Sequence, residues 1–236
     1  MDTNTWKEKS KDIVGNIIES EKFPCLFARK SWKSQNYNIA YVDYNENGFK
    51  EFFEALKDYT SYIKETDIKK RLLYPLIVIF KNSGKYHISH NFAWDALHWA
   101  IYKDDANWPD HINIDPDNSE WSVCFNSVEL FINISSPLHK KLKSRNLGDN
   151  LVLIINPRNN FDFVANGNTK EGMMIRDKIR NRIKEFNSGF VSEDLGYYGD
   201  INNLEWKQYQ LEEDDLPRPT KCPIANLIKF KNRVKR

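Results

Sequence analysis

Two uninterrupted apolar runs constrain the fold of this chain most strongly. Residues 74–80 read Tyr-Pro-Leu-Ile-Val-Ile-Phe, and residues 151–155 read Leu-Val-Leu-Ile-Ile. Continuous apolar runs of this length are typical of strands that are buried on both faces. Pro75 is expected at the start of the first run, where its missing N–H removes no ladder hydrogen bond. The two runs therefore predict a central sheet with helices packed on it.

The remaining periodicity predicts helices and strands in a mixed order. Three further strands are expected over residues 37–43, 120–126 and 128–134, the last two joined by a tight turn at Asn126-Ser127. Helices are expected over residues 6–18, 23–33, 49–66, 89–102, 137–143 and 170–186. A strand pair interrupts the helix–strand alternation. This order predicts an α+β (mixed α/β) fold in a single domain, 1–236, with about five strands covered by helices.

Composition and charge exclude several classes of protein. Hydrophobic residues make up 40% of the 236 residues, which is enough for a buried core. The net charge of +2 gives no general attraction to nucleic acid or to a membrane, and the basic segment 225–236 is expected as a solvated tail. There is no apolar run of eighteen residues and no secretory signal, and the cysteine count of three is odd. We therefore expect a cytoplasmic protein with free thiols.

Polar motifs gather around the second apolar run. A hydrophobic core alone does not require so many polar side chains. On either side of it stand Ser136-Pro137-Leu138-His139, Ser144-Arg145-Asn146-Leu147-Gly148 and Asn156-Pro157-Arg158. Later come Leu204-Glu205-Trp206-Lys207-Gln208-Tyr209-Gln210-Leu211 and Cys222-Pro223, and Phe23-Pro24-Cys25 stands near the start. No phosphate-binding glycine loop, zinc signature or Gly-x-Ser-x-Gly motif is present in the sequence. A pocket built from these motifs is therefore expected.

The order of these motifs, from about residue 22 to about residue 224, resembles the YqcI/YcgG family. One departure is Ile224, which stands where the family usually has phenylalanine after Cys-Pro. Characterised relatives include haem-dependent N-hydroxylases. The resemblance implies haem b as cofactor, a small amine or guanidine substrate and an electron donor, and it leaves a homodimer open. The alternatives are a haem- or metabolite-binding protein of the same fold without turnover, and a thiol redox protein centred on Cys25.

The axial haem ligand is left open between His139, Cys25 and Cys222, with His139 placed first as the metal ligand. Cys25 is expected in the first turn of a helix, where the dipole favours a thiolate, although an unpaired cysteine is often only a small buried hydrophobe. His139 could equally be a capping or surface histidine. His87, His90, His98 and His111 are its competitors. His87 and His90 fit capping at a helix start better, and His98 fits packing in the core better.

Basic and acidic side chains complete the expected site. Arg145, Arg158 and Lys207 are candidates for pairing with a propionate or a substrate carboxylate, and a salt bridge is the alternative for each arginine. Catalytic roles are assigned to Glu205, Gln208 and Tyr209, with Glu205 as the carboxylate that a cationic substrate would need. The alternative is a structural network that ties the C-terminal segment to the core.

Overall fold

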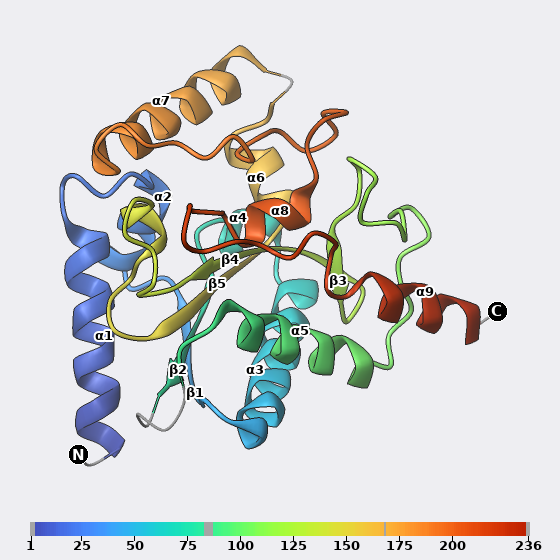
Figure 1. Ribbon diagram of the computed structural model, residues 1–236. Helices are drawn as coiled ribbons and strands as arrows, with labels where there is room; N and C mark the ends of the chain where they lie inside the picture. Colours follow the sequence, from blue (N-terminus) through green and yellow to red (C-terminus); the bar gives the residue numbers. More distant parts are fainter. Residues whose placement is uncertain (1–2, 83–86, 168, 235–236) are drawn as a thin grey trace.

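A five-stranded mixed sheet forms the centre of the computed structural model, which describes residues 3–82, 87–167 and 169–234 (Figure 1). The strand order is β1-β2-β5-β4-β3. The strands are β1 Asn38–Asp43, β2 Leu76–Lys81, β3 Val123–Phe125, β4 Val128–Ser135 and β5 Leu151–Pro157. β1 runs parallel to β2, and the other neighbours are antiparallel. The predicted α+β class and the number of strands are confirmed.

The two apolar runs pair with each other in the middle of the sheet. β2 lies against β5 with Leu76 opposite Ile155 and Phe80 opposite Leu151. Every residue of β2 from Leu76 to Phe80 is buried. Both strands are therefore covered on both faces, which explains why their sequences show no apolar–polar alternation.

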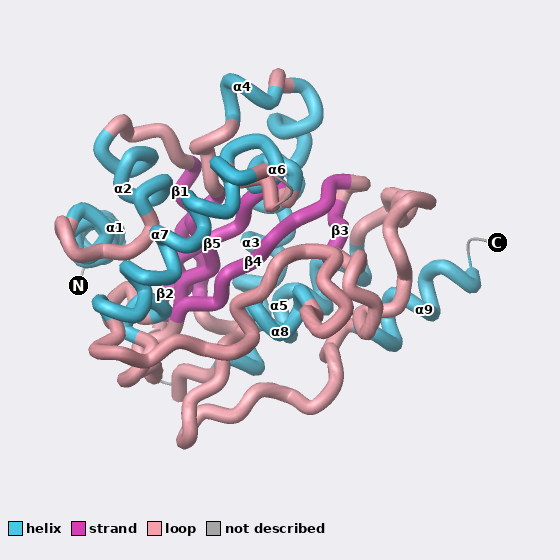
Figure 2. The backbone as a smooth tube through the Cα atoms, turned by 90° about the horizontal axis from the view of Figure 1, so that it is seen from above, coloured by secondary structure: helices cyan, strands magenta, loops and turns pink. Residues whose placement is uncertain are grey.

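Helices cover both faces of the sheet, as Figures 1 and 2 show. One face carries the larger core, packed by α3 Glu46–Glu65, α5 His90–Lys103, α8 Glu205–Tyr209 and α9 Ala225–Val234. The other face is covered by α1 Thr3–Glu19, α2 Leu26–Lys33 and α7 Lys170–Phe186. Short elements complete the chain: α4 Ile68–Arg71, the 3-10 turn η1 Lys143–Arg145 and α6 Asn159–Val164.

Local capping explains where several helices begin. The Asn45 side chain accepts the N–H of Gly48 at the start of α3, and Ser89 accepts the N–H of Asn91 at the start of α5. A side chain at position 48 is not possible, since its Cβ would lie 1.8 Å from the backbone oxygen of Asp43. The glycine therefore allows α3 to start directly against the end of β1.

Two expected elements differ in the structure. The predicted helix over residues 137–143 is a turn, because the Glu213 carboxylate accepts the N–H groups of Lys140, Lys141 and Leu142. The predicted strand over residues 120–126 is reduced to β3. The hairpin after β3 is confirmed, with positive φ angles of 52° at Asn126 and 59° at Ser127.

The C-terminal segment is not the solvated tail that its charge suggested. It forms α9, and Leu227 and Ile228 are buried in the core beneath it. The Lys231 ammonium donates hydrogen bonds to the backbone oxygens of Ile101 and Asp104 at the end of α5. Its basic residues are therefore partly used in packing. Residues 235 and 236 lie outside the described part of the chain.

Three arginines of α7 bond to the backbone of neighbouring segments. Arg176 donates to the backbone oxygen of Ala165, and Arg180 donates to that of Leu195. The Arg182 guanidinium reaches three backbone oxygens, those of residues 21, 23 and 24, at 2.6, 2.8 and 3.3 Å. These arginines hold α7 onto the neighbouring segments, and Arg182 holds it onto the segment that leads to Cys25.

Candidate functional site

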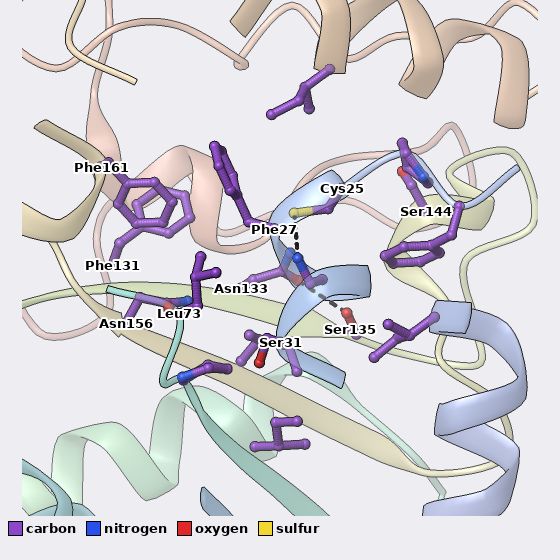
Figure 3. A pocket seen from close by; sticks show the side chains of 18 of the residues that line it. Cys25, Phe27, Ser31, Leu73, Phe131, Asn133, Ser135, Ser144, Asn156 and Phe161 are labelled. Carbon is purple, nitrogen blue, oxygen red and sulfur yellow. Dashed lines mark hydrogen bonds between the residues drawn. The ribbon is translucent and has the colours of Figure 1, made fainter. Parts of the chain in front are cut away.

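A cavity of about 280 Å³ lies between the sheet and the helices α2 and α7. Its floor is the β4–β5 face opposite the larger core, and Ile179 and Ile183 of α7 close it from the other side. Most of the lining is apolar. Polar atoms enter from the residues Cys25, Ser31, Asn133, Ser135, Ser144, Arg145, Asn156 and Asn160. Figure 3 shows Cys25 on the helix side and Asn133, Ser135 and Asn156 on the strands.

Cys25 lines this cavity as the N-cap residue of α2, one position before the expected first turn. Its Sγ accepts the N–H of Ala28 at 3.4 Å, so the thiol replaces the usual serine or aspartate cap. Burial nevertheless raises the pKa of the Cys25 thiol above its ordinary value, against the smaller effect of the backbone hydrogen bonds. The expected thiolate is therefore not favoured by the fold alone. This disfavours a thiol redox protein centred on Cys25.

Arg145 lines the same cavity and is 6% exposed. Its guanidinium donates to the backbone oxygens of Gln208 and Tyr209, at 3.0 and 3.3 Å. Among the described residues no carboxylate forms an ion pair with it, and burial lowers the pKa of Arg145 to about 9. A buried cation held only by carbonyl groups is suited to an anionic group of a ligand.

His139 is buried but does not line the cavity. Its Nδ1 lies 3.1 Å from Oε1 of Glu213, while no described residue bonds its Nε2. The ring of His90 is 5.0 Å away, centre to centre. Burial and the charge of Arg145 lower the pKa of His139 to about 4, so the imidazole is neutral near pH 7. This geometry places His139 in a packed contact between α5 and the 136–142 turn.

The Glu205–Tyr209 helix forms a closed network beside β4 rather than a cavity wall. The Tyr209 hydroxyl lies 2.8 Å from Oε1 of Glu205, donates to the backbone oxygen of Leu130 and accepts the N–H of Val123. Burial raises the pKa of Glu205 to about 8. The side chains of Glu205, Lys207, Gln208 and Tyr209 do not line the cavity. The helix contributes to the site through the two backbone oxygens that hold Arg145.

Arg158 and Cys222 are also held away from the cavity. The Arg158 guanidinium pairs with Glu129 at 3.2 Å and with Asp162, and it stacks on the ring of Tyr198 at 3.5 Å. Cys222 is buried in the larger core, where burial raises the pKa of its thiol to about 12. The expected pocket is thus brought together only in part. Cys25 and Arg145 line one cavity together with Asn156 and Ser144 of the same motifs. The other candidates do not line it: His139, Arg158, Glu205, Lys207, Gln208, Tyr209 and Cys222.

The sequence reasoning missed two features of the cavity. Asn133 and Ser135 interrupt the apolar strand β4 at alternate positions, so both point to the cavity face. That alternation was a usable signal. In α7, Ile175, Ile179 and Ile183 stand four residues apart, which predicts a packed face of the helix but does not show that this face closes a cavity.

Within the described residues, no group of three or more His, Cys, Asp or Glu side chains is arranged to hold a metal ion. No helix in the same part of the chain is long and apolar enough to cross a membrane. All three cysteines are free of disulfide bonds.

Fold and cavity together define an α+β protein with a mostly apolar cavity between its sheet and a helical cover. The chain belongs to the YqcI/YcgG family, whose sequence profile matches residues 14–225. It is 33% identical to the Streptomyces lavendulae protein named "Putative N(omega)-hydroxy-L-arginine synthase DcsA", over 95% of this chain and 86% of that protein. It is also 32% identical to "Uncharacterized protein YqcI" of Bacillus subtilis, over 98% of this chain and 91% of that protein. No solved structure gave a significant match.

Proposed function

We propose that this protein is a haem-dependent N-hydroxylase that acts on a small amine or guanidine compound. The observation that carries the proposal is the apolar cavity lined by both Cys25 and Arg145. Support for the reaction comes from the N-hydroxyarginine synthase name of the Streptomyces relative. In an N-hydroxylation, one atom of dioxygen enters an N–H bond, while electrons and protons from a donor reduce the other atom to water.

The cavity residues fit haem by their chemistry. Apolar side chains form most of the wall, and the Cys25 thiol is a soft donor of the kind that iron accepts. The unpaired Arg145 cation suits a propionate. We therefore assign ligation to Cys25, in preference to His139 and Cys222, which do not line the cavity. When bound, haem supplies the dioxygen chemistry that amino-acid side chains lack.

The chain itself would hold, enclose and orient the reactants. α7 excludes water from above the sheet, since Ile179 and Ile183 face the cavity and Arg182 fixes the helix to residues 21–24. Binding of a metal would remove the thiol proton that burial retains on Cys25. An electron donor is part of the proposal, since reduction of the second oxygen atom to water takes two electrons that the substrate does not supply.

The test is the absorption spectrum of the purified protein, followed by product analysis. We expect a Soret band, and an amine product heavier by one oxygen atom when dioxygen and a reductant are supplied. Cys25→Ala should lose or shift the band, while Cys222→Ala and His139→Gln should keep it. An unchanged spectrum in Cys25→Ala would contradict the ligand assignment. A parent protein without haem absorption, even after reconstitution, would contradict the haem proposal.

A further inference from the structure

Helix α2 separates the cavity from solvent by the width of a single helix. Phe27, Ala28 and Ser31 line the cavity, and Figure 3 shows Phe27 and Ser31 on the cavity side of α2. Lys30 and Lys33 of the same helix are exposed to solvent, and Figure 2 shows α2 at the edge of the molecule. An α-helix with its side chains is about 10–12 Å across, so the outer face of α2 lies about that far from the cavity.

The outer face of α2 is uniformly cationic. Arg29, Lys30, Lys33 and Ser34 border an open hollow on the surface, and α2 has no acidic residue. Among the described residues, no carboxylate forms an ion pair with these three cations. The Nε of Arg29 is buried, and no atom in the same part of the chain accepts a hydrogen bond from it. Three unpaired cations around one hollow attract an anionic surface.

The other helix over the cavity, α7, lacks this charge pattern. Glu171, Asp177 and Glu185 stand among its lysines, and Asp177 lies 4.0 Å from the guanidinium of Arg180. The α7 arginines also donate hydrogen bonds to backbone oxygens. An anionic partner would therefore meet attraction at α2 and mixed charges at α7.

We propose that the α2 face formed by Arg29, Lys30, Lys33 and Ser34 docks an acidic protein that carries single electrons, such as a [2Fe–2S] ferredoxin. The inference rests on the proposed function, which needs an electron donor, and it names the chemistry of that partner. Cys25, to which haem ligation is assigned, caps the same helix.

A carrier at this face would deliver electrons through α2. Each encounter would oxidise the carrier by one electron and reduce the haem centre by one electron. Two encounters supply both electrons that the second oxygen atom takes, and two protons from solvent complete the water molecule. A hydride donor has to touch its acceptor, which the intervening helix prevents. A single electron tunnels across this width, so the position of the face favours a one-electron carrier over a hydride donor.

The experiment measures binding of two probes, an acidic [2Fe–2S] ferredoxin and an acidic flavodoxin, to the protein as purified. Calorimetry at about 0.01 M and about 0.15 M salt compares weak with strong screening of charges. We expect a carrier to bind more tightly at low salt. Arg29→Glu/Lys30→Glu/Lys33→Glu should weaken this binding about tenfold or more, which corresponds to about 1.4 kcal/mol. Lys30→Glu/Lys33→Glu changes only exposed side chains and should weaken it in the same direction.

A matched control places the same change of charge on α7. Lys170, Lys178 and Lys184 are exposed, and their replacement by glutamate should leave carrier binding within about twofold of the parent protein. In the haem-loaded protein, the rate at which the reduced carrier changes the haem absorption should fall in the α2 variants and not in the α7 variant. Binding of neither carrier, no loss in the α2 variants, or an equal loss in the α7 variant would overturn the inference.

These results also separate the inference from the proposed function. Formation of an N-hydroxylated product with a chemical reductant, while neither carrier binds, would overturn the inference and leave the proposed function intact. Binding of a carrier at α2 by a protein that takes up no haem would support the docking face and contradict the proposed function.

Discussion

The two faces of the β4–β5 pair are built from alternate residues of the same strands, yet one is filled and the other is hollow. Leu151, Leu153 and Ile155 of β5 enter the larger core and are fully buried. Ile154 and Asn156, between and after them, line the cavity. The polar residue Asn156 therefore lies on the face of β5 that the core side chains do not fill. Burial of a strand does not mean that both of its faces serve stability.

Shortening a side chain should lower the free energy of unfolding much more on the filled face than on the cavity face. This is the largest effect that we expect. Leu153→Ala removes a fully buried side chain from the filled face and should lower the free energy of unfolding by about 2–5 kcal/mol. Asn156→Ala, three residues along the same strand, should change it by less than about 1 kcal/mol, because its neighbours already border empty space. Denaturant unfolding of both variants measures the difference. Equal losses would show that the cavity face is packed as tightly as the core.

Enlargement should give the next largest contrast. Ala96 of α5 is fully buried on the filled face, so Ala96→Leu should cost about 1–3 kcal/mol through overpacking. Ala28 of α2 lines the cavity, and Ala28→Leu should be within about 1 kcal/mol of the parent protein. The same variant should reduce haem binding, because the added side chain occupies cavity volume. Thermal unfolding of both variants and haem binding by Ala28→Leu measure these effects. A larger loss of stability in Ala28→Leu than in Ala96→Leu would contradict the comparison.

The pH dependence of stability should report the buried carboxyl group beside the filled face. The pKa of Glu205 is raised by burial to about 8 from its ordinary value of 4.5, so the folded state keeps a proton that the unfolded state releases. This contribution to stability is complete below about pH 4.5 and is lost as the pH rises through 8. Its slope is at most about 1.4 kcal/mol per pH unit. Glu205→Gln should remove this part of the slope, and an unchanged unfolding profile in that variant would count against a protonated Glu205.

Removal of the contacts that hold α7 over the hollow face should cost less stability than the core substitutions Leu153→Ala and Ala96→Leu. Arg182→Met deletes the hydrogen bonds to residues 21, 23 and 24 and should cost about 1 kcal/mol. It should also increase the rate of Cys25 alkylation several-fold, because the helix then covers the cavity less firmly. Cys124 and Cys222 provide internal controls, since both are buried away from α7. A rate that rises equally at all three thiols would indicate general unfolding instead.

The sequence predicted the strands that surround the site better than the residues that form it. The apolar runs identified β2 and β5, because a strand that is buried on both faces has apolar residues at nearly every position. Cys25 and Arg145 were among the candidates, and both line the cavity. Arg158 carried the same sequence signal as Arg145. Only the fold shows that Glu129 and Asp162 neutralise Arg158, because these contacts depend on how distant segments are placed.

The clearest difference lies in the turn that follows β4. The local sequence predicts a helix over residues 137–143. The carboxylate of Glu213, about seventy residues later in the chain, takes the N–H groups that this helix would have used. His139 is bound by the same carboxylate. A residue so far away in sequence leaves no local signal. Neither the loss of the helix nor the position of the histidine could therefore be predicted from the sequence.

The amino-acid sequence by itself determined the strands, the class of fold and the family to which the chain belongs. These follow from hydrophobic periodicity and from motifs that remain in order along the chain. The tertiary structure decided which polar residues share a cavity, which arginine lacks a counter-charge and which thiol faces the cavity. The physical reason is that burial and pairing are properties of three-dimensional neighbours. Two arginines with the same local sequence signal therefore differ only once the chain has folded around them.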